Sequence, residues 1–175
     1  ANVCQIAKLK GCRVIGSVGS DEKAQWLKEE CGVDEVINYK TCGDLSAALM
    51  QAAPEGIDVY FENVGGDHLQ AALNAMNPYG RIAACGMIAS YNSAEPAPGP
   101  NNLMLIVGKK IRINGFIVSD HTDWRDAFLG DMIPWIQQGK IKSQETVVEG
   151  LDQAVSAFLA LFSGNNFGKM VVKLS

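Results

Sequence analysis

Short polar segments that follow apolar runs are the residues of this sequence that could do chemistry. Gly19-Ser20-Asp21-Glu22-Lys23 follows one such run, Asn63-Val64-Gly65-Gly66 follows another, and Cys85-Gly86-Met87-Ile88 follows a third. Glycines let a ligand approach the backbone closely, and the amides at a helix N-terminus attract phosphate. The spacing therefore predicts a site for a phosphate-bearing ligand, provided that these segments meet at one edge of a sheet.

The pattern up to Gly139 predicts the elements that must position these segments. Apolar runs over 13–18, 35–39, 57–61, 80–86 and 111–119 are predicted as strands, and the amphipathic segments around them as helices, the first over 2–10. A proline-rich loop over 94–100 is expected to be a mobile surface segment or part of a cleft rim. The alternation is typical of an α/β fold, a doubly wound parallel sheet of the Rossmann type, whose ligands lie at the carboxyl ends of the strands.

The last third of the chain has a different pattern. Residues 123–139 are predicted as a longer helix, bent or begun anew near Pro134. After it, 145–148 and 169–174 are predicted as strands on either side of a helix with one apolar face. That face comprises Leu151, Ala154, Val155, Phe158, Leu159 and Phe162. We therefore place a boundary near Gly139 and expect the strand–helix–strand segment after it to belong to another sheet.

Composition excludes several classes of function. Fifteen Lys plus Arg against nineteen Asp plus Glu give a net charge of −4, without the basic stripe of a nucleic-acid binder. No apolar stretch approaches the roughly 18 residues of a membrane span, and no secretory signal pattern is present, so a soluble, cytoplasmic protein is expected. Five cysteines without a C-x-x-C pair fit reduced thiols, and two histidines outside any H-E-x-x-H pattern predict no metal site.

The residues around Lys23 bear on which dinucleotide would bind. In Rossmann folds an acid after the discriminating strand binds the ribose 2′-hydroxyl of NAD, whereas small residues and a cation accept the 2′-phosphate of NADP. Gly19, Ser20 and Lys23 follow the strand here, which favours NADP. The alternative is that Lys23 is a solvated lysine on a helix surface beside two acids, and the pattern alone leaves both open.

Several ordered motifs together resemble one family over essentially the whole chain. They are QIAKLKGCRV at 5–14, GSDEK at 19–23, INYK at 37–40, YFENVGG at 60–66, GRIAACG at 80–86, GFIV at 115–118 and NFGK at 166–169. The family is the zinc-independent medium-chain dehydrogenases/reductases, in the branch of prostaglandin reductases, leukotriene 12-hydroxydehydrogenases, plant alkenal double-bond reductases and bacterial curcumin reductases. The resemblance implies NADP(H) as cofactor and a reaction without a metal.

The resemblance also implies site residues. Lys23 and Tyr39 match contacts to the adenosine 2′-phosphate, for which an ammonium and a phenol are suitable partners. Asn63 matches an asparagine beside the cofactor, and Asn166 matches a late cofactor contact. The loop along the pyrophosphate and nicotinamide ribose corresponds to Cys85, Gly86, Met87, Ile88, Ala89, Ser90 and Tyr91. The backbone strip that hydrogen-bonds the nicotinamide carboxamide corresponds to Phe116, Ile117 and Val118.

Departures from the family pattern limit what the resemblance implies. Relatives place a strand and a glycine-rich phosphate loop before the helix at 2–10, and a substrate domain before those. We therefore expect residues 1–139 to be an NADP-binding Rossmann domain lacking its first strand and that loop. Residues 140–175 would return to the substrate (GroES-like) domain. Gly108 stands where animal relatives carry a tyrosine proposed to assist catalysis, so the catalytic acid is left unassigned, and His121 and Asp123 are expected as surface-loop residues.

Competing functions remain open at this point. The first is NADPH-dependent reduction of the carbon–carbon double bond of small-molecule enones or enals, by a homodimer joined through the nucleotide domain. The alternative is a catalytically incompetent nucleotide-binding or dimerisation fragment of such a reductase. An S-adenosylmethionine methyltransferase shares the α/β pattern, but it would want an acid where Gly19 and Ser20 stand.

Overall fold

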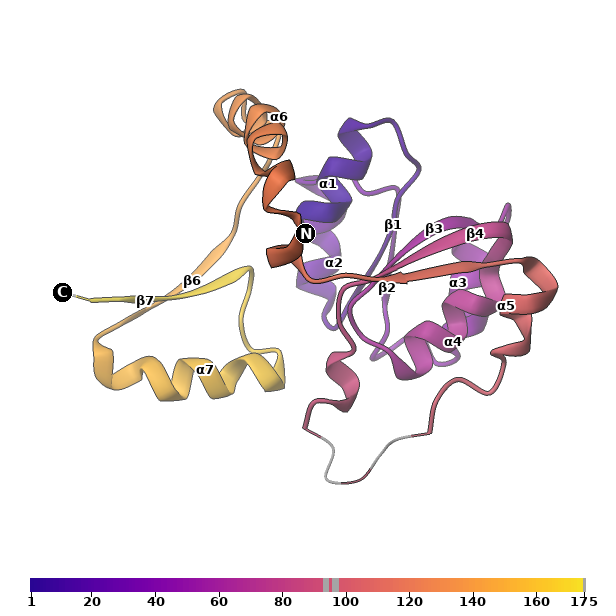
Figure 1. Cartoon of the computed structure of the whole chain (residues 1–175). Helices are drawn as coiled ribbons and strands as arrows, with labels where there is room; N and C mark the ends of the chain where they lie inside the picture. The colour runs from indigo at the N-terminus through magenta and orange to yellow at the C-terminus, as the bar shows by residue number, and fades with distance from the viewer. Residues whose placement is uncertain (93–94, 96–97, 175) are drawn as a thin grey trace. The chain divides into compact units, whose positions relative to one another are not determined.

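The computed structural model describes all residues except 93–94, 96–97 and 175. Its compact parts are a first unit, residues 1–38 with 129–175, and a second unit, residues 39–128. All strand pairs given for the described residues are parallel, and helices separate the strands along the chain (Figure 1). The α/β architecture with parallel sheets that the sequence predicts is therefore confirmed.

The N-terminal part of the first unit is a strand–helix–strand layer. It comprises α1 (Asn2–Leu9), β1 (Ile15–Val18), α2 (Asp21–Glu29) and β2 (Glu35–Asn38), with β1 paired to β2. The Ser20 side chain accepts a hydrogen bond from the Lys23 amide, as expected of a helix cap. Val14, Leu27, Cys31 and Val33 form the buried core of this layer.

The C-terminal part of the first unit has a sheet of its own. Here α6 (Arg125–Gln137), which begins in the second unit, is followed by β6 (Glu145–Glu149), the 3₁₀ helix η3 (Leu151–Gln153), α7 (Ala154–Ser163) and β7 (Lys169–Lys173). Among the described strands, β6 pairs with β7 alone, as expected of a segment that belongs to another sheet. α6 continues through Pro134, so of the two expected alternatives, a bent helix or a new start, the new start is excluded.

The second unit contains a three-stranded sheet in the order β3-β4-β5. It comprises α3 (Leu45–Ala52), β3 (Ile57–Glu62), α4 (Gly66–Ala75), β4 (Met76–Ala84), η1 (Ile88–Ser90), α5 (Met104–Lys109), β5 (Arg112–Gly115) and η2 (Val118–Trp124). Leu69, Leu73, Met76, Ile82 and Ile111 form its core, where α4 packs on the sheet (Figure 1). Leu69 and Leu73 recur at the helical spacing of one face of α4, and this face is the one that the core buries.

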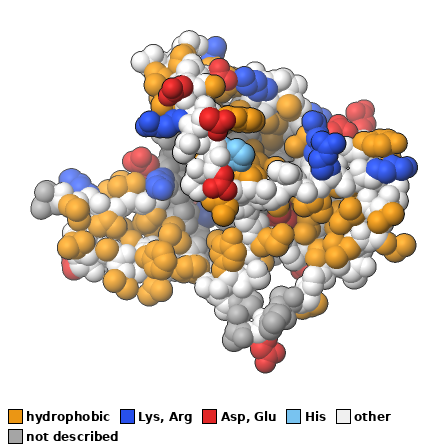
Figure 2. Space-filling model, viewed as in Figure 1, with side chains coloured by type: hydrophobic (Ala, Val, Ile, Leu, Met, Phe, Trp, Pro, Cys, Tyr) orange, Lys and Arg blue, Asp and Glu red, His pale blue; other side chains and the backbone are white. Residues whose placement is uncertain are grey.

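Other expectations need correction. The fifth strand ends at Gly115 rather than at 119, because its neighbour β4 ends at Ala84 and the last bond runs from the Phe116 amide to the Ala84 carbonyl. The apolar face of α7 is exposed rather than buried: Val155 is 70% and Phe158 58% accessible, and Figure 2 shows hydrophobic side chains gathered over this helix. Residues 94, 96 and 97 of the proline-rich loop lie outside the described residues.

Candidate functional site

The carboxyl ends of β3 and β4 are joined by backbone hydrogen bonds beyond the strands themselves. The amides of Cys85 and Gly86 donate to the Glu62 carbonyl, at 2.9 and 3.1 Å. The Ile88 amide donates to the Asn63 carbonyl, and the Ala89 amide to the Val64 carbonyl. The structure therefore brings Asn63 and the predicted loop 85–91 together at one edge of the sheet, as parallel topology requires.

Glycines allow these two loops to approach each other. Gly65 has φ +76°, which strains any other residue, and a Cβ there would lie 3.2 Å from Cβ of Met87. A Cβ on Gly86 would lie 3.0 Å from the Tyr91 hydroxyl oxygen, which accepts a hydrogen bond from the Met87 amide. Glycine at position 65 therefore lets Met87 pack against the turn after β3, and glycine at position 86 leaves room for the Tyr91 hydroxyl.

Glu62 fixes the turn that carries Asn63. Its side chain is fully buried, and Oε1 accepts hydrogen bonds from the amides of Val64 and Gly65 and from the Tyr60 hydroxyl. No hydrogen-bond partner for Oε2 exists among the described residues. Burial, and then the Glu62 carboxylate, raise the pKa of the Tyr60 hydroxyl, so it stays a donor. Val64 and Gly65 directly precede α4, so the Glu62 side chain fixes the turn that leads into this helix.

The end of β5 adds an aromatic row to the same unit. The Phe116 ring contacts the Phe61 ring edge-on, with 6.1 Å between centroids, and lies 6.1 Å from the His121 ring. His121 in turn lies 5.8 Å from Trp124. Phe116 is half-buried, while Ile117 and Val118 are exposed, and Val118 begins η2. The predicted strip 116–118 is therefore largely a loop beyond β5.

Tyr39 lies just past β2 and belongs to the second unit. Its ring meets the His68 imidazole edge-on, with 4.9 Å between centroids and 76° between planes. His68 is half-buried on the first turn of α4, and this burial lowers its pKa although the carboxylates of Glu62 and Asp67 act in the opposite direction. The imidazole is consequently neutral at pH 7.

Two predicted residues, Lys23 and Asn166, lie on neighbouring segments of the first unit. The Lys23 ammonium donates a 2.8 Å hydrogen bond to the carbonyl of Gly164, the residue that ends α7. The Trp26 ring contacts the Phe167 ring edge-on at 5.8 Å, and the Asn166 amide donates to the Gly168 carbonyl. The start of α2 and the turn that carries Asn166 are thus adjacent, although 143 positions separate Lys23 from Asn166.

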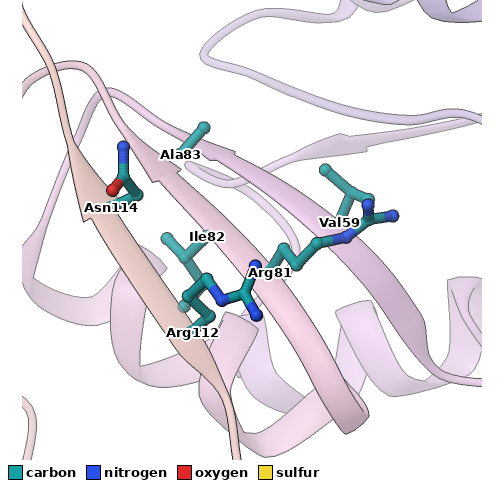
Figure 3. A pocket seen from close by; sticks show the side chains of 6 residues that line it. All are labelled: Val59, Arg81, Ile82, Ala83, Arg112 and Asn114. Atoms are coloured by element: carbon teal, nitrogen blue, oxygen red, sulfur yellow. The ribbon is translucent and has the colours of Figure 1, made fainter.

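A concavity of about 380 Å³ lies elsewhere, on a face of the β3-β4-β5 sheet (Figure 3). It is lined by Val59, Arg81, Ile82, Ala83, Arg112 and Asn114. Arg81 and Arg112 are register partners on neighbouring strands. None of the predicted cofactor residues lines it, so this hollow is not the predicted site. Among the described residues, no three His, Cys, Asp or Glu side chains are grouped to hold a metal ion.

Two residues of this arrangement were not predicted as functional. Glu62 stands inside the YFENVGG motif, but its signal in the sequence is only an acid at the end of an apolar strand. His68 gives no signal of its own, because its contact with Tyr39 joins residues 29 positions apart.

Comparison with known proteins places the chain in a family. Residues 1–132 match the family model described as zinc-binding dehydrogenase. The chain is 50% identical over 173 residues to 2-alkenal reductase (NADP(+)-dependent) of Nicotiana tabacum, covering 99% of this chain and 50% of that protein. It is 46% identical to prostaglandin reductase 1 of Bos taurus, covering 98% of this chain and 52% of that protein.

Solved structures agree with these matches. The structure of CurA in complex with NADPH from Vibrio vulnificus is similar with a TM-score of 0.91 and 42% identity, covering 99% of this chain and 52% of that one. The chain thus spans about half the length of the relatives it matches. With most of its length matched by the family model and close relatives among alkenal and prostaglandin reductases, this chain belongs to the zinc-binding dehydrogenase family, in the zinc-independent branch of the medium-chain dehydrogenases/reductases.

Proposed function

We propose that this chain carries the NADP(H)-binding part of a reductase that acts on the carbon–carbon double bond of α,β-unsaturated aldehydes or ketones. The observation that carries the proposal is the meeting of Asn63 and the loop 85–91 at the carboxyl ends of β3 and β4, where parallel sheets bind their ligands. The 50% identity to a protein named an NADP(+)-dependent 2-alkenal reductase supports both the cofactor and the reaction class.

Each unit, taken by itself, contains residues proposed to bind the cofactor. In the first unit, Lys23 contacts the 2′-phosphate and Asn166 makes a further contact. In the second unit, Tyr39 also contacts the 2′-phosphate, and Asn63 with residues 85–91 follows the pyrophosphate and nicotinamide ribose. The backbone at 116–118 binds the carboxamide. The 2.8 Å bond from Lys23 to the Gly164 carbonyl supports the placement of a cation beside the Asn166 turn.

The bound cofactor supplies a hydride for the carbon β to the carbonyl, and a proton then reaches the α carbon of the enolate. The chain's part in this chemistry is to hold the dinucleotide along the sheet edge and to orient its reactive ring. We assign no catalytic acid among the described residues. An enone or enal of low molecular weight is the proposed substrate class.

We also propose how the chain divides into domains, how it assembles and where it is located. Residues 1–139 form the nucleotide-binding domain, and residues 140–175 contribute to the substrate domain. The exposed apolar face of α7 supports this division, because such a face is stable only when something covers it.

β5 is exposed along its length and pairs only with β4 among the described strands. That edge supports a homodimer in which β5 meets its counterpart. The five free cysteines support a cytoplasmic location.

A catalytically incompetent fragment is the second candidate. The observation in its favour is that the chain spans about half of its relatives. Steady-state turnover of an enal with NADPH by this chain would exclude that candidate. A chain that binds NADPH without turnover would support it.

Thermal unfolding with each cofactor tests the proposed function. NADPH at about 100 times its Kd adds roughly 2.7 kcal/mol to the free energy of unfolding, which raises Tm by about 5–10 °C for a chain of this size. NADH is expected to give a smaller shift. Lys23→Glu should abolish the difference between the cofactors, whereas Lys28→Glu, the same charge change farther along α2, should retain it. Equal shifts with both cofactors in the unsubstituted chain would refute the assignment of NADP(H).

A further inference from the structure

The contact between Tyr39 and His68 has no role in the function proposed above. Tyr39 follows the end of β2 in an exposed position, and a side chain there is free to rotate unless a neighbour restricts it. The described neighbour is the His68 imidazole, whose ring lies 4.9 Å from the Tyr39 ring at 76°. Edge-on pairs at this separation are attractive and restrict rotation of both rings.

The surroundings of His68 fix its ring in turn. His68 is the third residue of α4, the helix that follows the turn whose Val64 and Gly65 amides bind the buried Glu62 carboxylate. Leu69, the next residue, is buried in the core of the second unit. Position 68 is therefore attached to the most constrained part of this unit, while Tyr39 lies on a connecting loop. We therefore treat the His68 ring as the fixed partner of this contact and the Tyr39 ring as the partner whose position can change.

The chemistry of the imidazole suits a packing role. Burial lowers the pKa of His68, so its ring is uncharged under physiological conditions. An uncharged ring adds no charge of its own to attract the 2′-phosphate. The contact with Tyr39 gives position 68 a route to the choice of cofactor that needs no charge on the imidazole.

We propose that His68 is a specificity-determining positioning residue: its ring holds the Tyr39 phenol where the hydroxyl can donate to the adenosine 2′-phosphate, and so favours NADP(H) over NAD(H). This inference rests on the proposed function, since it needs Tyr39 to contact that phosphate. It goes beyond the family resemblance, which assigns nothing to position 68. The edge-on contact with Tyr39 requires a flat ring at position 68.

Cofactor titration of the unsubstituted chain, three single variants and one double variant tests the inference. The Kd values of NADPH and NADH are measured by fluorescence for the unsubstituted chain, His68→Ala, His68→Phe and Tyr39→Phe. We expect His68→Ala to weaken NADPH binding by about three- to tenfold, the scale of one aromatic pair, and to leave NADH unchanged. His68→Phe keeps a flat ring and should restore the NADPH affinity. Combining His68→Ala with Tyr39→Phe should cost no more than Tyr39→Phe alone.

The outcomes separate this inference from the proposed function. An unsubstituted chain without preference for NADPH would overturn both. If Tyr39→Phe weakens NADPH binding and His68→Ala does not, only the role of His68 is overturned. Equal weakening of both cofactors by His68→Ala, or an additive loss in the double variant, would show a merely structural role and overturn it as well. Circular dichroism identifies a variant that unfolds. If His68→Ala unfolds, the Kd values of NADPH and NADH for His68→Phe, which keeps a ring in contact with Tyr39, test the inference instead.

Discussion

Gln5 is the clearest test of how the first unit is held together. The side chain is 1% exposed on α1, and both of its amide atoms bind the backbone of Lys142. Nε2 donates to the Lys142 carbonyl at 3.0 Å, and Oε1 accepts from the Lys142 amide at 2.7 Å. This pair of bonds fastens the segment between α6 and β6 to a helix 137 positions earlier.

The expected magnitude follows from the groups that lose a partner. Gln5→Leu keeps the side-chain volume but leaves one N–H and one C=O of Lys142 unpaired. Each such group costs about 1–3 kcal/mol when buried. Because Lys142 is itself at the surface, water can reach its backbone in part, and we expect a loss of about 2–4 kcal/mol in the free energy of unfolding. The corresponding fall in Tm is about 5–15 °C.

Urea denaturation followed by circular dichroism measures this loss. The midpoint should fall while the m value stays constant, since the fold itself is retained. Gln25→Leu is the matched control, because that amide is exposed and bonds only to Glu29 one turn along α2; its loss should stay within about 0.5 kcal/mol. A loss below about 0.5 kcal/mol for Gln5→Leu would refute the argument that the buried amide fastens the segment at Lys142.

Further predictions concern titration, thiol reactivity and a lysine. The lowered pKa of His68 means that the unfolded chain binds more protons below about pH 6.5. The free energy of unfolding should therefore fall as pH drops from 7.5 to 5.5, and His68→Phe should flatten that slope in denaturation at both pH values. Burial raises the pKa of the Cys31 thiol to about 11, whereas Cys12 is exposed. Iodoacetamide at pH 8 should therefore label Cys12 before Cys31, and mass spectrometry would detect this order. The reverse order would contradict the burial of Cys31. The Lys109 ammonium donates to three carbonyls at the end of α4, whereas the Lys110 ammonium lies over the Tyr79 ring. Lys109→Met should therefore lower the free energy of unfolding in urea by about 1–3 kcal/mol, more than Lys110→Met does. Equal losses would contradict this capping role.

The elements set by local pattern could be predicted from the sequence. Ser20 caps α2 as expected, and Leu73 faces inward on α4 because the spacing of apolar residues alone decides which side of that helix is buried. The length of β5 could not be predicted in this way. A strand continues only as long as a neighbour supplies hydrogen bonds, and the turn at Cys85 removes that neighbour after Ala84.

Long-range partners explain the other differences. On α1 the apolar pattern points to Val3, yet Val3 is exposed and the polar Gln5 is buried, because its partner Lys142 lies far along the chain. The apolar face of α7 has the spacing of a core helix, but in this chain it is exposed. A sequence pattern states that a face is suited to burial; it does not state which surface buries it.

The glycines that shape the candidate site could be predicted from the sequence. The main-chain hydrogen bonds between its loops could be predicted less well. Gly65 and Gly86 were visible in the sequence, and both permit close approach between the loops. The bonds from Ile88 and Ala89 to the turn after β3 are made by main-chain atoms, so they depend little on side-chain type. Glu62 is different, because a buried carboxylate that binds two amides cannot be exchanged for an apolar side chain without leaving those donors unpaired. The shape of the site therefore depends most on two glycines and one acid, Gly65, Gly86 and Glu62.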